Sequence, residues 1–229
     1  MVKRARFELT NNEKIEFNYS SIEEYVNSKF EPYFGQQQIE IYESVYKKTP
    51  HKIPKNINKL ISDKILGKDE ELQEIFPKTK FIIKNIPLTE KGYPRERMAF
   101  NRLKISDFDG EWEDSYWKKY YEETTFIMIC YAEKNKSRNG YRILKKIKTI
   151  KFNQEELLSF KKTYNQLKIA IKFEDPSLLP IPNSFEGQLL ELAPKGQKGD
   201  DAYNNFFKEN STKTCFMLNK RFINKKLNE

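Results

Sequence analysis

The spacing of the hydrophobic residues changes near Lys78, and this change limits the folds that the chain can adopt. Before Lys78, apolar side chains recur every three or four positions, which is typical of amphipathic helices. After it, apolar runs of strand length alternate with further helical stretches, and residues 125–132 are apolar enough for a central strand. This order predicts an α/β domain with a helical N-terminal part and a central mixed sheet flanked by helices.

Local sequence patterns predict the positions of the individual helices and strands. Ser20 or Ser21 can cap the first helix, and Glu23 or Glu24 can complete a capping box. Further helices are expected at residues 36–48, 56–66, 107–123, 153–171 and 220–227. Strands are expected at residues 81–86, 98–105, 125–132, 141–152, 188–192 and 214–218.

Composition excludes several classes of protein. The chain has 229 residues, enough for one large domain, and 38% of them are hydrophobic, which is too many for a disordered chain. The single histidine, His51, excludes most histidine-based catalysis and metal cages. Cys130 and Cys215 lie among apolar neighbours, which predicts buried thiols in a reducing cytoplasm. No apolar run approaches the roughly 18 residues of a membrane span.

The charge balance indicates a polyanionic partner. Lys and Arg number 42 and Asp and Glu 33, so the net charge is 42 − 33 = +9, which suits nucleic acid. Arg95, Arg97 and Arg102 lie on or beside one expected strand, and Lys195 and Lys198 flank a glycine-containing loop. A solvated charged surface is the alternative interpretation of each group.

A second group of candidates is acidic. Asp107, Asp109, Glu111, Glu113 and Asp114 offer oxygen ligands of the kind that hard cations prefer. Their spacing fits no calcium-binding loop, and acidic side chains before a helix interact favourably with its dipole. A structural role is therefore expected for them.

Residues 81–88 (FIIKNIPL) resemble a strand of the MutH family of GATC-specific DNA endonucleases, the strand that carries the second and third active-site residues. Other stretches resemble the same family and occur in its order, and two of the stretches look closest to the C-terminal MutH-like half of Sau-type type II restriction endonucleases. The stretches are residues 21–26, 30–33, 111–115, 192–195 and 215–220. The resemblance covers about residues 20–228 and implies a restriction-endonuclease-like fold.

The resemblance also implies that this chain does not cleave DNA. In the family, an Asp and a Glu hold Mg²⁺ and a Lys two residues after the Glu helps to orient water. Counted back from Lys84, the Glu position is Ile82 and the Asp position is Ile75. An isoleucine has no lone pair, so no catalytic or metal-binding residues, and no cofactor, are expected in this chain; Mg²⁺ belongs to the catalytic half of the family.

The family reads DNA with a loop that corresponds to residues 193–196 here. Ala193 replaces an arginine and Met217 replaces a tyrosine of the mismatch-repair members, which puts the reading of GATC in doubt. The residues expected to contact DNA are Lys84, Arg95, Arg97, Pro194, Lys195, Gly196, Lys198, Met217 and Lys220.

Together these features predict an N-terminal arm (residues 1–19) and a single MutH-like DNA-binding domain (residues 20–229). Its expected role is that of an allosteric effector domain that binds double-stranded DNA, with GATC as the expected site, beside a catalytic MutH-like domain in cis or in trans. One alternative is an active Mg²⁺-dependent endonuclease whose ligands have moved to Glu90 or Asp107. Another is a protein-interaction module that docks a catalytic nuclease subunit through an aromatic surface at residues 112–121.

Overall fold

The structure, a computed structural model, describes residues 5–6, 16–17, 19–67, 70–136, 138–195, 203, 205–208 and 213–229. The chain forms two compact units, each built from two separate segments. The first unit contains residues 1–92 and 125–150, and the second unit contains residues 93–124 and 151–229. The expected DNA-binding domain, residues 20–229, includes parts of both, and its identity as one functional domain remains a prediction.

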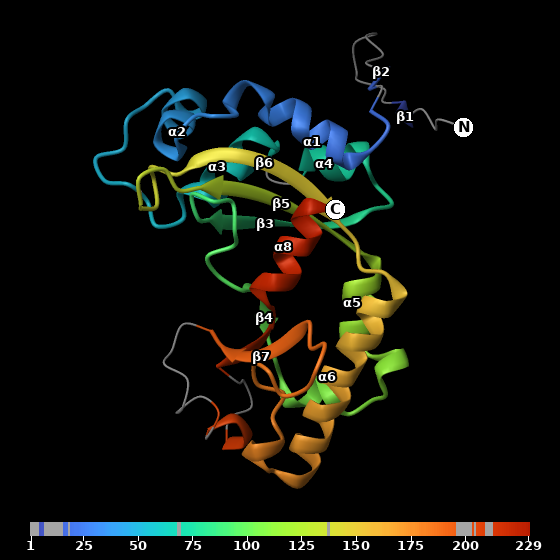
Figure 1. The fold of residues 1–229 in the computed structure, drawn as a ribbon. Coiled ribbons are helices and arrows are strands. Elements are labelled where there is room, and N and C mark those ends of the chain that lie inside the picture. Colours follow the sequence, from blue (N-terminus) through green and yellow to red (C-terminus); the bar gives the residue numbers. More distant parts are fainter. Residues whose placement is uncertain are drawn as a thin grey trace. The chain divides into compact units, whose positions relative to one another are not determined.

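A three-stranded sheet is the centre of the first unit. Its strands are β3 (Lys80–Leu88), β5 (Thr124–Ala132) and β6 (Ile143–Ile150), in the order β3-β5-β6. β5 is antiparallel to β6 but points the same way as β3, so the sheet is mixed (Figure 1). All residues of β5 are buried, which confirms the prediction of a central strand there.

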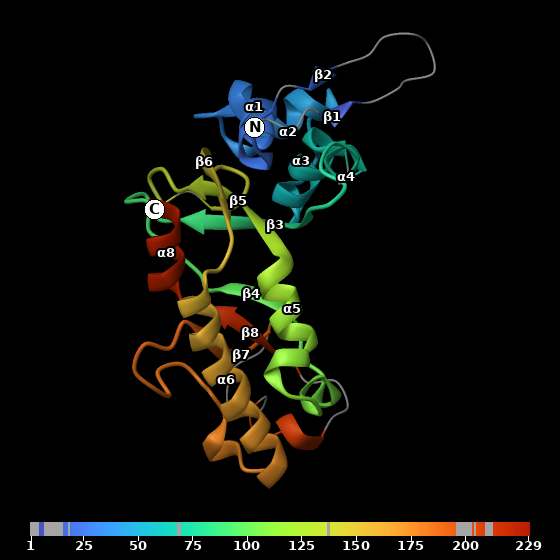
Figure 2. The ribbon, with the colours of Figure 1, turned by 90° about the vertical axis from the view of Figure 1, so that its right-hand side faces the viewer.

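Four helices cover one face of this sheet (Figures 1 and 2). Ser21 caps the first helix by accepting a hydrogen bond from the Glu24 amide, and the Glu24 carboxylate accepts one from the Ser20 amide. The helices are α1 (Ile22–Phe30), α2 (Gln38–Tyr46), α3 (Ile57–Ile65) and α4 (Glu70–Ile75). The first three confirm the predicted helices, whereas α4 was not predicted. A short antiparallel pair, β1 (Ala5–Arg6) and β2 (Glu16–Phe17), precedes them.

Gln38 ties the helices of the first unit to the connection between β5 and β6. Its side chain is fully buried, and its Oε1 accepts hydrogen bonds from the backbone N–H groups of Gly140 (2.8 Å) and Arg142 (3.1 Å). Its Nε2 donates to Oδ1 of Asn58 and of Asn139. One amide side chain therefore satisfies two backbone donors and two side-chain acceptors.

We expect Gln38→Leu to lower the free energy of unfolding by about 2 kcal/mol, because it leaves two backbone N–H groups without their acceptor. Urea unfolding followed by circular dichroism measures this loss. Gln36→Leu is the matched control, since the Gln36 amide makes one exposed hydrogen bond to the Pro32 carbonyl. If both variants lose the same stability, the network around Gln38 does not have this role.

The second unit is built on a separate antiparallel sheet. Its strands are β4 (Met98–Arg102), β8 (Thr214–Leu218) and β7 (Leu190–Pro194), in the order β4-β8-β7. Its helices are α5 (Tyr116–Glu123), α6 (Gln154–Phe173) and α8 (Lys220–Asn228). Short 3₁₀-helices occupy Glu31–Tyr33 in the first unit and Ile105–Phe108, Trp112–Asp114, Pro176–Leu178 and Phe206–Lys208 in the second.

Aromatic side chains form the core between this sheet and its helices. Phe100 on β4 contacts Tyr120 and Tyr121 on α5, and Phe216 on β8 contacts Trp117. Trp117 and Tyr121 are at most 1% exposed, so residues 112–121 do not form the aromatic docking surface considered above. That expectation is wrong because the spacing of these aromatic residues on α5 directs them inward; Tyr116, at 53% exposed, is the exception.

Two further expectations need correction. The strands after residue 78 form two three-stranded sheets rather than one central sheet, because β4 pairs with β8, and β8 with β7, while β3 and β6 flank β5. β7 begins at Leu190 rather than at Gln188. The Gln188 side chain instead binds the preceding loop, accepting from the Ser184 amide (2.9 Å) and donating to the Pro180 carbonyl (3.1 Å).

Candidate nucleic-acid interface

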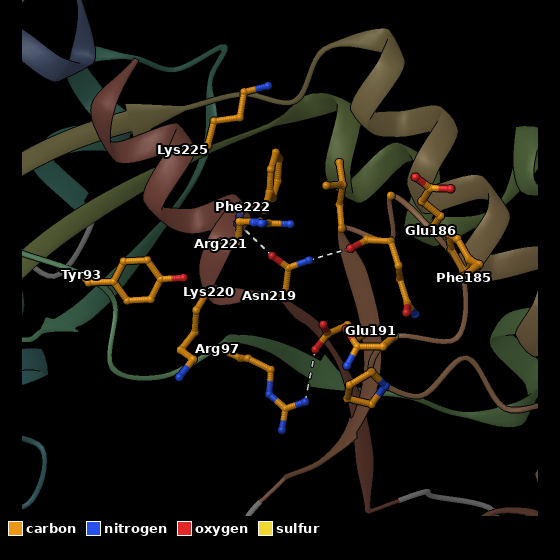
Figure 3. A pocket seen from close by; sticks show the side chains of 15 residues that line it. Tyr93, Arg97, Phe185, Glu186, Glu191, Asn219, Lys220, Arg221, Phe222 and Lys225 are labelled. Carbon is orange, nitrogen blue, oxygen red and sulfur yellow. Dashed lines mark hydrogen bonds and ion pairs between the residues drawn. The ribbon is translucent and has the colours of Figure 1, made fainter.

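An open pocket of about 920 Å³ lies within the second unit (Figure 3). Residues before β4, residues 182–189, β7 and the first turns of α8 line it. Its charged residues comprise four cations and two carboxylates, a balance of 4 − 2 = +2, and we call this site the basic pocket. They are Arg97, Lys220, Arg221, Lys225, Glu186 and Glu191.

Helix α8 supplies three of the four cations, two from its first turn (Lys220 and Arg221) and one from its last turn (Lys225). Asn219 caps this helix, because its Oδ1 accepts a hydrogen bond from the Phe222 amide (2.8 Å). Its Nδ2 donates to the Gln188 carbonyl (2.6 Å), which fixes the helix start to the loop before β7. Lys220, Arg221 and Lys225 are exposed on this helix. Positive side chains beside the positive end of a helix dipole make this end of the pocket suited to an anion.

An ion pair lies at the sheet end of the pocket. Arg97 Nη1 is 3.2 Å from Glu191 Oε2, and the Glu191 side chain is 8% exposed whereas that of Arg97 is 36% exposed. Glu191 belongs to β7, where it is in register with Met217 on β8. Figure 3 shows the guanidinium extending beside the carboxylate on the pocket wall. A buried carboxylate is costly without a partner, so Arg97 satisfies Glu191.

Two of the residues predicted to contact DNA line this pocket, and two more neighbour lining residues in the sequence or in the sheet. Arg97 and Lys220 line it, and Arg95 is exposed two residues before Arg97. Met217 is half-buried in the middle strand of the sheet, opposite Glu191 and Ala99. The structure therefore brings part of the predicted interface together.

Pro194 and Lys195 lie at the other end of β7. Pro194 is in register with Thr214, and the Lys195 amide donates to the Lys213 carbonyl (2.9 Å). The Lys195 ammonium donates to the Phe100 carbonyl (2.9 Å), so in this conformation it binds the backbone of its own sheet. Gly196 and Lys198, the other predicted contacts of this loop, lie outside the described residues.

The predicted remnant of a metal site belongs to the first unit. Ile75 is 6% exposed and lies in the hydrophobic core beneath the helices, as part of the cluster that Phe81 and Ile83 also contact. Because side chains alternate along a strand, Ile82 and Lys84 occupy the opposite face of β3. Both are half-buried. Both expected metal positions therefore carry aliphatic side chains.

The acidic residues of the second unit make ion pairs with residues distant in sequence, which supports a structural role for them. Glu113 binds Lys161 (2.7 Å) and Glu111 binds Lys168 (2.5 Å), and both lysines belong to α6. The hydrogen bond from Lys161 is the main cause of a lowered pKa at Glu113. Asp107 accepts a hydrogen bond from the Lys104 amide (3.1 Å). Within the part of the chain that the structure describes, no three acidic, histidine or cysteine side chains are grouped as a metal site.

Comparison with known proteins adds no relative: no protein-family model matches the chain, and no curated protein is significantly similar to it. Both cysteines are buried free thiols, as predicted. No helix of the described ranges is long and apolar enough to span a membrane.

Sequence reasoning missed several residues of the basic pocket. Arg221 and Lys225 follow the capping asparagine Asn219 by two and six residues, and this capped basic helix was a usable signal. Glu191 was missed because it lies within an apolar strand. No local sequence pattern connects it with Arg97, which is 94 positions away.

Proposed function

We propose that this chain is a non-cleaving module that binds double-stranded DNA, of the kind found as the effector half of MutH-like restriction endonucleases. The observation that carries the proposal is the basic pocket, in which Lys220 and Arg221 lie at the capped N-terminus of α8 and Lys225 lies in its last turn. Lysine, arginine and helix N-termini are common contacts to DNA phosphates. The net charge of +9 supports the same partner.

The absence of cleavage in this proposal rests on two side chains. Ile75 and Ile82 stand at the positions where the family that the sequence resembles holds its metal, and neither can coordinate a cation. Lys84 remains at the third position and is a candidate contact to a phosphate. We therefore propose no cofactor for this chain; a catalytic MutH-like domain, in cis or in trans, would supply the Mg²⁺-dependent step. The proposed setting is the cytoplasm, where the thiols of Cys130 and Cys215 stay reduced.

The proposal predicts DNA binding that needs no metal and weakens steeply with salt. If the chain neutralises six phosphates, the logarithm of the binding constant should fall with the logarithm of salt concentration with a slope of about −5. Mobility-shift titrations of GATC and scrambled duplexes in EDTA, at several salt concentrations, measure this slope and the sequence preference. Binding that does not respond to salt would contradict the proposal.

Cleavage is tested separately with the same protein. Plasmid containing GATC sites, incubated with Mg²⁺ or Mn²⁺, should remain intact. Cutting that disappears in Glu90→Ala or Asp107→Ala would instead identify an active nuclease with relocated ligands.

A further inference from the structure

The ion pair in the basic pocket distinguishes one of its four cations from the others. Arg97 is bound to the Glu191 carboxylate, whereas the described residues provide no carboxylate partner for Lys220 or Arg221. Lys225 pairs with Glu229 at 3.7 Å, where both side chains are substantially exposed. Arg97 is thus the cation of this pocket that is matched by a buried negative charge.

This pairing makes Arg97 a poor general contact for phosphate. The charge of Glu191 cancels that of Arg97, so the pair gains little from Coulomb attraction to a polyanion and releases few counterions. A buried carboxylate beside a phosphate would also repel it. Lys220 and Arg221, which have no carboxylate partner among the described residues, are better suited to the backbone of DNA.

The same pairing suits Arg97 to a contact that depends on geometry. A guanidinium has five N–H donors in a fixed plane, and Glu191 uses one of them, so four remain. Glu191 also restricts the rotation of a long side chain, which lowers the entropy lost on binding. Two parallel N–H groups of arginine match the O6 and N7 acceptors of guanine in the major groove.

We propose that Arg97 reads a guanine in the DNA bound at the basic pocket, and that Glu191 is the positioning residue that holds its guanidinium. This inference rests on the proposed function and assigns it a specificity-determining pair. Lys220, Arg221 and Lys225 bind the phosphates, and Arg97 supplies the discrimination between base pairs.

The test begins with selection of preferred duplexes from a randomised pool by the full chain in EDTA. Each guanine of the selected duplex is then replaced in turn by 7-deazaguanine, which lacks the N7 acceptor. For the wild type, one of these replacements should weaken binding about fivefold or more. Arg97→Lys keeps the positive charge and can keep the ion pair but loses the fork of donors. It should lower the preference for the selected duplex about tenfold and respond less than twofold to 7-deazaguanine at that position.

Glu191→Gln provides a readout that a purely structural role would not change. The variant keeps a hydrogen-bond acceptor for Arg97 but removes the negative charge, so the arginine becomes available to phosphates. Binding to scrambled duplex should strengthen and its salt slope should steepen by about one, while the preference for the selected duplex falls. Thermal unfolding of each variant confirms that it is folded.

The outcomes separate this inference from the function on which it rests. If Arg97→Lys weakens all duplexes equally, or responds to 7-deazaguanine as the wild type does, Arg97 is not the reader. If the selection yields no preferred duplex but salt-dependent binding persists, the reader is refuted and DNA binding stands. If no duplex binds, the proposed function fails, and the assignment of Arg97 fails with it.

Discussion

Replacing Lys226 by methionine should lower the free energy of unfolding by about 3 kcal/mol, because it leaves a buried carboxylate without its cation. The Lys226 ammonium is 3.0 Å from Glu156 Oε1 and 2.8 Å from Glu229 Oε2. The side chains of Lys226 and Glu156 are 10% and 5% exposed, so water cannot readily replace the lost partner. Urea unfolding at neutral pH measures the change.

The protonation of Lys226 determines the pH at which this experiment should be done. Burial by itself lowers the pKa of this lysine, but hydrogen bonds from its ammonium to Glu229 and Glu156 outweigh burial and raise the pKa above the ordinary 10.5. A cation whose pKa is raised by folding contributes its full stabilisation below the ordinary pKa. It loses that contribution only as the pH rises through the folded value. Lys226 is therefore fully charged at neutral pH.

A second substitution shows whether the stability is lost because the Glu156 carboxylate has no cation or because the Lys226 side chain no longer packs. Glu156 also completes the capping box of α6, in which it accepts a hydrogen bond from the Asn153 amide (2.9 Å). Glutamine can keep that bond without the charge. Glu156→Gln combined with Lys226→Met should therefore recover most of the lost stability. If the double variant is as unstable as Lys226→Met, the loss comes from packing of the lysine stem.

Reversing two charges at the start of α8 should weaken DNA binding about 100-fold. Lys220→Glu with Arg221→Glu removes two charge-assisted contacts, each of roughly 1.5 kcal/mol or more, and adds repulsion. The same change places acidic residues in the first turn of the helix, where they interact favourably with the dipole. The variant should therefore be at least as stable as the wild type, and a loss of binding cannot be attributed to unfolding.

Mobility-shift titration at one low salt concentration measures this effect. Lys162→Glu with Lys172→Glu is the matched control, because it reverses the same number of charges at exposed positions of α6 that do not line the pocket. The control should lose much less affinity. Equal losses in both variants would show that net charge, and not the basic pocket, governs binding.

Elements with a local signal were predictable from the sequence. Ser21 and Asn153 each begin a helix with a capping box or its equivalent, and α1 and α6 start there. The strand predicted at residues 214–218 has the bounds of β8, Thr214–Leu218. α4 escaped prediction because its six residues are too few to display a helical period.

Features that depend on distant contacts were not predictable. The division of the strands into two sheets depends on which strands pair, and β4 pairs with β8 rather than with a neighbour in sequence. The candidate site shows the same limit. Arg97 and Lys220 were predicted from their charge alone. Glu191 could be assigned to the site only from its ion pair with Arg97, which the fold brings close to it.

The division of each unit between two chain segments has a consequence for biosynthesis. The sheet of the first unit lacks its middle and outer strands, β5 and β6, until the ribosome has passed Ile150. β4 is synthesised early but cannot pair until β8 has been synthesised, because in the folded sheet Met98 lies opposite Leu218. Such long-range closures slow folding, and neither unit can be obtained by simple truncation at one end. A nascent chain stopped before Thr214 would leave β4 without its partner strand.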